Sequence, residues 1–174
     1  MKLAPATSID SLEVQRILWD AFGTEHGPVV ATIATDLLVD DTAQPSFAFM
    51  VEEGGVEVGC IIFSNISIDT APHIKASILA PLGVMRDYQN QGLGKGLVQQ
   101  GLQSLESYGV EVVFAYGDPN YYRRFGFTNN HNIKAPHRLN HPDAWQALEL
   151  RSGVLDGVVG KAHCAIPLDD PQIW

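Results

Sequence analysis

The sequence predicts an α/β fold with a mixed sheet, in one domain spanning residues 1–174. Helical apolar periodicity alternates with strand-like apolar runs along the chain. One of these runs, residues 110–116, is nearly continuous, which is typical of a buried strand with a parallel neighbour. The 174 residues, 45% apolar and 18% charged, are enough for one full core, and no linker, repeat or low-complexity segment divides them.

Two helices are expected first. Asp10 and Glu13 have the spacing of a capping box, and apolar residues then recur at helical spacing. Gly23 is expected to end this helix. A second helix is predicted to begin at Pro28, because proline is favoured in the first turn of a helix.

The later elements alternate strands and helices. They begin with a hairpin (residues 46–52 and 56–64) and a long central strand (73–85). A helix then runs from the following loop to residue 108 and is ended by Gly109. An apolar strand (110–116), a short helix (120–125) and a last pair of strands that includes residues 158–165 complete the chain.

The most informative segment is a glycine-rich loop between the central strand and the following helix. It reads Gln89-Asn90-Gln91-Gly92-Leu93-Gly94. The first N–H groups of a helix have no partner inside it, and the helix dipole places partial positive charge there. Glycines let an anion approach the backbone closely. The loop therefore predicts a phosphate-bearing ligand held near residues 91–95.

Two common phosphate loops do not match. The nucleoside-triphosphate loop needs Ser or Thr after Gly-Lys and a glycine five positions earlier, where this chain has Gly96 and Gln89. The dinucleotide fingerprint needs a third glycine where Leu97 stands, and no acidic residue ends a strand about twenty residues later.

The pattern that remains, Gln-x-x-Gly-x-Gly, resembles the acetyl-coenzyme-A loop of the GNAT superfamily of N-acetyltransferases. Residues 82–88 look like the strand end and turn that precede this loop in the family. About thirty residues later, residues 122–127 resemble the family's Tyr-x-x-x-Gly-Phe, and residues 117–127 resemble the signature of its YhbS-like branch. The resemblance implies a GNAT-like mixed, mostly antiparallel central sheet with a splayed parallel strand pair, flanked by helices.

The resemblance also implies an activity. The chain is expected to move an acetyl group from acetyl-coenzyme A to a primary amine, small or peptidic, by direct attack in a ternary complex. An alternative is a non-catalytic module that binds acyl-coenzyme A as a sensor or interaction protein. Transfer of a longer acyl group stays open, and homodimers are frequent among the relatives.

Several site residues follow from the resemblance. Tyr122 aligns with the general acid, with Tyr121 in reserve, although Tyr122 could simply pack the short helix. The backbone at Val84 is the expected oxyanion donor, and Arg86 extends the edge that pairs with the pantetheine arm. The expected coenzyme contacts are Leu82, Gly83, Val84, Gln89, Asn90, Gln91, Gly92, Leu93, Gly94, Lys95 and Asn120.

The polar residues among these have alternative roles. Lys95 and Arg86 either pair with phosphates or are solvated surface. Gln89 holds the loop or touches a phosphate, and Asn120 is expected to cap the short helix. The base is not assigned: Glu25, His26, Asp69 and His73 all fall in suitable regions, and water could also accept the proton. Residues 129–145 are expected to be a loop near the acceptor site or a plain surface excursion.

The composition limits which ligands and which cellular location are expected. The net charge of −9, from 11 basic and 20 acidic residues, argues against nucleic acid and is compatible with a cationic amine. Apolar runs are too short to cross a bilayer, and no secretory signal is visible. Cys60 and Cys164 lack metal or redox spacing and are expected to be buried thiols. No metal is expected, and the location is predicted to be cytoplasmic.

Overall fold

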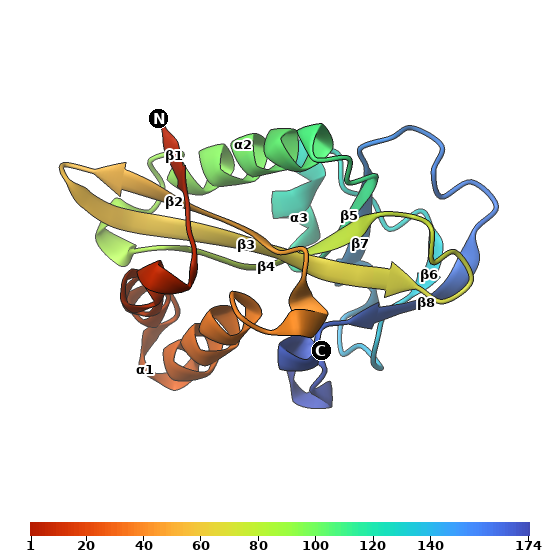
Figure 1. Ribbon diagram of the computed structural model, residues 1–174, viewed down its shortest axis with the longest axis horizontal. Coiled ribbons are helices and arrows are strands. Elements are labelled where there is room, and N and C mark those ends of the chain that lie inside the picture. The colour runs from red at the N-terminus through yellow and green to blue at the C-terminus, as the bar shows by residue number, and fades with distance from the viewer.

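The computed structural model describes residues 1–174 as one mixed sheet between two helical layers (Figure 1). Its elements are β1 (Leu3–Pro5), α1 (Ser11–Leu37), β2 (Phe47–Glu53), β3 (Val56–Ile68), β4 (Ala76–Val84), α2 (Leu93–Ser107), β5 (Val112–Tyr116), α3 (Pro119–Tyr122), β6 (Asn132–Lys134), β7 (Trp145–Glu149) and β8 (Val159–Cys164). Short 3-10 turns lie between several of them.

The strands run in the order β1-β2-β3-β4-β5-β7, and neighbours along this path are antiparallel except for β4 and β5. β8 pairs with the last residues of β3, and the three-residue β6 pairs with β8 in parallel. The expected mostly antiparallel sheet with one central parallel pair is confirmed. The additional β6–β8 pair is too short to leave a signal in the sequence.

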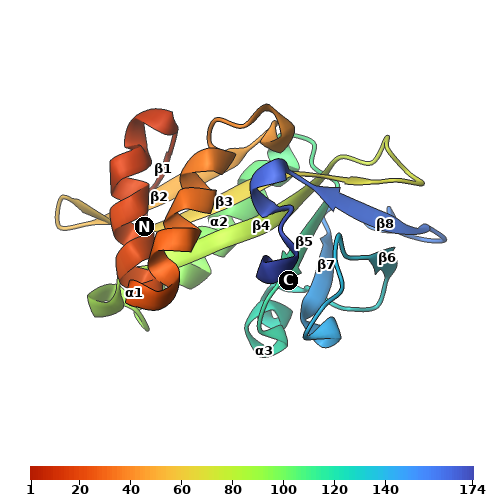
Figure 2. The ribbon, with the colours of Figure 1, turned by 90° about the horizontal axis from the view of Figure 1, so that it is seen from below.

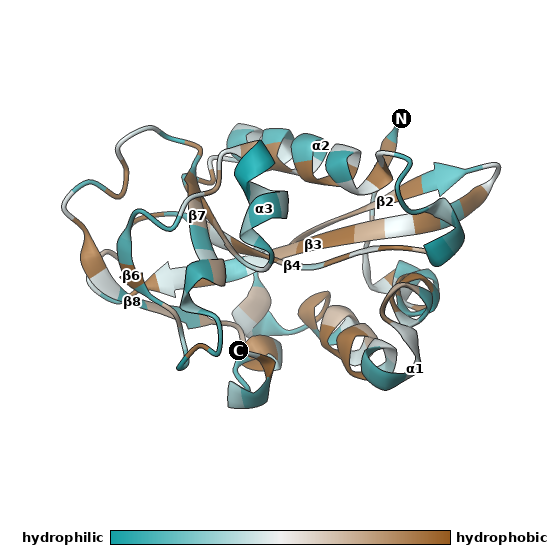
Figure 3. Ribbon diagram, turned by 180° about the vertical axis from the view of Figure 1, so that it is seen from behind, coloured by the Kyte–Doolittle hydropathy of each residue, from teal (hydrophilic) through white to brown (hydrophobic).

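The two helical layers cover opposite faces of the sheet. α1 lies under one face, and α2 lies over the other (Figures 1 and 2). Each layer closes its own apolar cluster, of 29 and 16 buried residues respectively. Figure 3 shows the polar residues of α2 on its outer side and the apolar ones toward the strands. The sheet is therefore buried on both faces, and a ligand has access where strands part or end.

α1 contains a sharp turn at Gly23, whose φ of 75° is left-handed and favours glycine. The predicted end of the first helix at Gly23 is confirmed. The second segment begins directly after this turn, so the predicted start at Pro28 is wrong, and Pro28 lies inside the helix. Gly27 explains the geometry: a Cβ there would lie 2.7 Å from the carbonyl oxygen of Trp19. The helical segments before and after Gly23 therefore pack with their backbones in contact.

The predicted capping box at Asp10 and Glu13 is also wrong. The box is formed one turn earlier, where Thr7 caps a 3-10 turn and Asp10 is its third residue. The Asp10 carboxylate accepts the Thr7 N–H at 2.8 Å. Because Asp10 is used there, its side chain does not cap α1.

The separation of β4 from β5 is the feature that opens the sheet. Their pairing ends at Leu79 and Ala115, whereas β4 continues along β3 as far as Val84. At the same point β4 carries an irregularity, with Ala80 and Pro81 opposite a single residue of β3. Such a bulge bends a strand, and Pro81 has no N–H to offer to a neighbour. The predicted splay of the parallel pair is confirmed.

The remaining elements agree with the sequence analysis to within a few residues. The hairpin turns at Gly54 and Gly55, α2 ends at Ser107 with Tyr108 as its C-cap before Gly109 (φ 84°), and a short helix continues into a 3-10 turn up to Phe125. Phe127, which follows this turn, is in the core. No helix is both long and apolar enough to cross a membrane.

Both cysteines are free thiols, as expected. Cys60 is buried in β3, and burial raises the pKa of its thiol to about 12. Cys164 in β8 is only partly buried, yet desolvation still raises the pKa of its thiol to about 11. Neither sulfur therefore carries thiolate near neutral pH.

His131 gives the fold a pH dependence. Its Nδ1 accepts the Ile133 N–H at 3.2 Å, and its Nε2 is buried without a partner against the rings of Phe114 and Trp145. Burial lowers the pKa of His131 below its usual 6.5. The unfolded chain therefore binds a proton that the folded chain refuses, and the free energy of unfolding should fall as the pH drops through about 6.5.

Urea unfolding measured between about pH 8 and pH 5 tests this. His131→Phe should flatten the decline, whereas His73→Gln, at an exposed histidine, should keep the wild-type slope. Equal slopes for wild type and His131→Phe would contradict the assignment.

Candidate functional site

A cavity of about 450 Å³ lies between the N-terminus of α2, the end of β4 and α3. Nine residues line it: Val84, Tyr88, Gln89, Asn90, Gly92, Gly94, Lys95, Tyr121 and Arg124. The glycine-rich loop and the tyrosine motif, about thirty residues apart in sequence, therefore meet at one site.

The loop presents a run of free N–H groups to this cavity. None of the backbone N–H groups of residues 90–95 donates to a backbone acceptor, and the first such bond of α2 runs from Gly96 to Gly92. Asn90 and Gly92 have φ values of 60° and 85°, both left-handed. Alternating left-handed residues turn successive N–H groups to one side, which makes a concave anion site. The helix dipole adds to the same preference.

The charged side chains that line the cavity are positive, as an anion site requires. Lys95 and Arg124 are its charged residues, and no carboxylate lines it. Arg124 was not foreseen from the sequence. Its guanidinium lies 4.5 Å from the ring centroid of Tyr121, and its Nε donates to the Tyr121 carbonyl at 3.3 Å. The spacing of three residues on a short helix is the one signal that could have indicated this pair.

The open edge of β4 borders the cavity. The Met85 N–H donates to Val58 in β3, so by the alternation of an antiparallel pair Val84 and Leu82 direct their backbone groups away from β3. Gln89 confirms the direction, because its side-chain amide donates to the Val84 carbonyl at 2.8 Å. Gln89 thus holds the loop against the strand, one of the two roles expected for it.

Five of the expected coenzyme contacts do not line the cavity. Leu82 lies on the open edge of β4 just beyond it. Gly83 faces α1, where a Cβ would come within 2.7 Å of Leu18, and the Leu93 side chain is buried under α2. The Gln91 amide donates to the Asp87 carbonyl at 3.2 Å. Asn120 is exposed.

Hydrogen bonds near the site contradict two further expectations. Asn120 does not cap the short helix; Asp118 does, accepting the Asn120 N–H at 2.9 Å. The Arg86 N–H donates to the Asp20 carboxylate at 2.7 Å, so it is not free to extend the open edge. The Arg86 guanidinium packs over Gly23 at the turn of α1.

The adjacent tyrosines occupy different surroundings. The hydroxyl of Tyr121 lies 3.1 Å from where a Cβ on Gly94 would be, and its ring lines the cavity. The ring of Tyr122 packs on Gly117, directly after β5, and on Phe127. Burial raises the pKa of Tyr122 well above its usual 10, and it raises that of Tyr121 as well. Both phenols therefore stay protonated across the range in which proteins are usually assayed.

The topology separates the four candidate bases. Asp69 and His73 precede Ala76, at the end of β4 away from Val84. At about 3.3 Å per residue, they lie roughly 26 Å or more from the cavity. Asp69 has a structural role: its carboxylate accepts the Lys161 N–H at 2.8 Å, which lowers its pKa. Glu25 and His26 remain near the turn of α1, with 86% and 70% of their side chains exposed.

A metal site is not part of this arrangement. No group of three or more His, Cys, Asp or Glu side chains lies close enough together to hold a metal ion.

Known proteins with a related sequence share this layout. The family model described as "Acetyltransferase (GNAT) domain" matches residues 44–129. The uncharacterized N-acetyltransferase YhbS of Escherichia coli K12 is 32% identical over 132 residues, which cover 71% of this chain and 76% of that protein. The chain belongs to the GNAT family of acetyltransferases. The matched segment contains the β4–β5 separation, the glycine-rich loop and the tyrosine motif.

Other GNAT proteins extend the similarity over the whole chain. The uncharacterized N-acetyltransferase YjhQ of Escherichia coli K12 is 28% identical over 166 residues, covering 91% of this chain and 88% of that protein. The crystal structure of Escherichia coli YhbS in complex with CoA superposes with a TM-score of 0.85 at 26% identity, covering 97% and 92% of the two chains. A GNAT family acetyltransferase from Brucella melitensis, in complex with acetyl-CoA, has the same fold, with a TM-score of 0.71 at 24% identity and 97% coverage of each chain.

Proposed function

We propose that this protein transfers an acetyl group from acetyl-coenzyme A to a primary amine by direct attack within a ternary complex. The observation that carries the proposal is the run of free N–H groups at residues 90–95, beside the open edge of β4. YhbS and the Brucella melitensis acetyltransferase were solved with CoA and acetyl-CoA, which supports the same ligand for this fold.

The cavity and the open edge of β4 suit two parts of this ligand, its pyrophosphate and its amide-containing arm. Acetyl-coenzyme A supplies the acetyl group and, through its pyrophosphate, the negative charge that the cavity suits. The N–H groups of the loop, with Lys95 and Arg124, would hold the pyrophosphate. The Leu82 backbone groups and the Val84 N–H, which point away from β3, would pair with the amide-containing arm as a neighbouring strand would.

The chemistry needs three things of the protein. The Val84 N–H would stabilise the carbonyl oxygen, which gains charge as the amine attacks. Tyr122 would donate a proton to the departing sulfur, because burial keeps its phenol protonated and so available as a donor. The amine must arrive without its extra proton, and water or a residue near the turn of α1 would accept it.

Titration calorimetry with acetyl-coenzyme A, followed by product detection with a panel of amines, tests the proposal. Binding together with an acetylated amine is the expected result. Binding without a product from any amine would instead favour the non-catalytic sensor. A folded protein that does not bind acetyl-coenzyme A would overturn the ligand assignment. A cytoplasmic location and a homodimer stay predictions.

A further inference from the structure

Two adjoining recesses lie beyond the end of β5, separate from the cavity at the glycine-rich loop. The inner recess, of about 540 Å³, begins at Tyr116 and Gly117 and reaches α3. The outer recess, of about 920 Å³, lies among β6, β7 and β8. Both are lined by Pro142 and Asp143, so they adjoin at this shared wall and together form one charged hollow.

The inner recess adjoins the proposed reaction centre. Gly117 forms part of the wall of this recess, and the ring of Tyr122 packs against it. Tyr116 is the last residue of β5, beyond the point where β5 has parted from β4. The Tyr116 hydroxyl accepts the His141 N–H at 3.1 Å, which fixes the opposite wall to this strand end.

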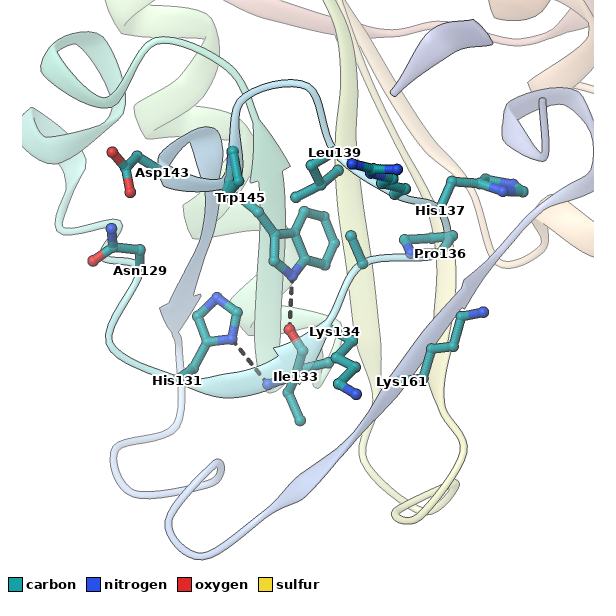
Figure 4. A pocket seen from close by; sticks show the side chains of 13 residues that line it. Asn129, His131, Ile133, Lys134, Pro136, His137, Leu139, Asp143, Trp145 and Lys161 are labelled. Atoms are coloured by element: carbon teal, nitrogen blue, oxygen red, sulfur yellow. Dashed lines mark hydrogen bonds between the residues drawn. The ribbon is translucent and has the colours of Figure 1, made fainter. Parts of the chain in front are cut away.

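The two recesses carry opposite charge. The charged residues of the inner recess are two carboxylates, Asp118 and Asp143. The outer recess contains Lys134, Arg138 and Lys161 against the single carboxylate of Asp143. Figure 4 shows Asp143 on one side of Trp145, and Lys134 and Lys161 on the other. The charge therefore changes sign from the inner recess to the outer recess of this hollow.

None of these charges is neutralised by an ion pair, although the Asp118 carboxylate also caps α3 by accepting the Asn120 N–H at 2.9 Å. The ion pairs of the chain are Glu25 with His26, Asp169 with His137, and Glu111 with Arg151. None of the five charged residues of the hollow takes part in one. The chain has a net charge of −9 and only 11 basic residues, so three unpaired cations in one recess are not explained by surface solubility.

We propose that the acceptor is a primary amine carrying an anionic group, a carboxylate or a phosphate, at its far end. The inference rests on the proposed acetyl transfer. The amino group occupies the inner recess near Asp118 and Asp143, and the anion lies among Lys134, Arg138 and Lys161. In the reaction the C–N bond forms and the thioester C–S bond breaks. The ammonium releases one proton to solvent, Tyr122 gives its proton to the departing sulfur, and the second amine proton restores the Tyr122 hydroxyl.

The test compares amines of similar chain length that do or do not carry a distal anion. β-Alanine and ε-aminocaproate provide the carboxylate, phosphoethanolamine provides the phosphate, and propylamine, pentylamine and cadaverine lack an anion. The anionic amines should have kcat/KM values at least about tenfold higher, with the better of the two anions identified by the comparison.

Charge reversal locates the effect. Lys161→Glu and Lys134→Glu, both at exposed positions, should raise KM for the anionic amine about tenfold and leave kcat and the affinity for acetyl-coenzyme A unchanged. The same variants should lower KM for cadaverine. Lys2→Glu, an exposed lysine far from the hollow in the sequence, changes the net charge equally and should behave as wild type.

Two results would count against the inference in distinguishable ways. Equal kcat/KM for amines with and without the anion, or unchanged KM in both reversal variants, would overturn the anionic acceptor while leaving acetyl transfer intact. Failure of the folded protein to bind acetyl-coenzyme A would instead overturn the proposed function, and the acceptor assignment with it.

Discussion

Replacing Gly94 with glutamate is expected to abolish the binding of acetyl-coenzyme A. Gly94 lies in the first turn of α2 and lines the cavity among the free N–H groups. The new carboxylate would stand where the pyrophosphate is expected. Two unit charges about 4 Å apart near a protein surface repel by about 4 kcal/mol, which corresponds to nearly a thousandfold loss of affinity.

Gly94→Gln is the matched control for this variant. It adds the same volume beside the Tyr121 hydroxyl, 3.1 Å from the position of the new Cβ, but no charge. Both residues are better helix formers than glycine, and the φ of Gly94 is not left-handed, so α2 should remain folded. Calorimetry should show a much smaller loss for Gly94→Gln. Equal losses for both variants would mean that volume, and not a phosphate, explains the effect.

The anion-binding loop could be predicted from the sequence because its conformation depends on residues close together in the chain. Free N–H groups at a helix start and left-handed glycines depend on neighbouring residues only, and Gly92 and Gly109 have φ values of 85° and 84°. The parting of β4 and β5 came from the family resemblance and was confirmed by the pairing that ends at Leu79.

The contacts that sequence reasoning missed involve neighbours far along the chain. The coenzyme contact expected of Gly83 stays a prediction, but the sequence did not indicate that its lack of a side chain makes room for Leu18 of α1. Arg86 loses its free N–H to Asp20, 66 residues away. Asp69 and His73 seemed close to the site because they precede β4, yet the length of that strand places them at its other end. Such contacts leave no periodic signal.

The charged hollow shows the same limit in another form. Lys134 and Lys161 come from β6 and β8, which pair in parallel although they are distant in sequence. Residues 129–145 lack a clean period, and either a surface excursion or a loop near the acceptor was expected. The segment in fact provides walls of both recesses, and this depends on where β7 and β8 bring it.

Removing the hydroxyl of Tyr122 is expected to reduce kcat by about a hundredfold, the lower end of what a general acid contributes. Tyr122→Phe keeps the ring that packs on Gly117 and Phe127, so the fold should be unaffected. The KM for acetyl-coenzyme A should change little. Tyr121→Phe is the comparison, because Tyr121 lines the coenzyme cavity and its loss should act on KM instead.

Gly117 provides an independent way to displace the same hydroxyl. A Cβ at this position would lie 2.7 Å from Cε2 of Tyr122, too close for the ring to stay where it is. The φ of Gly117 is not left-handed, so alanine is compatible with the backbone there. Gly117→Ala should therefore lower kcat through Tyr122, although it removes no chemical group.

A double-mutant cycle decides whether the two effects have one cause. If Gly117→Ala acts by moving the Tyr122 hydroxyl, it should cost little in a Tyr122→Phe background, because the hydroxyl is already absent. Additive losses in kcat would show that the acid is another group, with Tyr121 as the next to test. A full loss in Gly117→Ala alone, with Tyr122→Phe close to wild type, would assign the role of this corner to the backbone after β5, and Tyr122 would then be a packing residue.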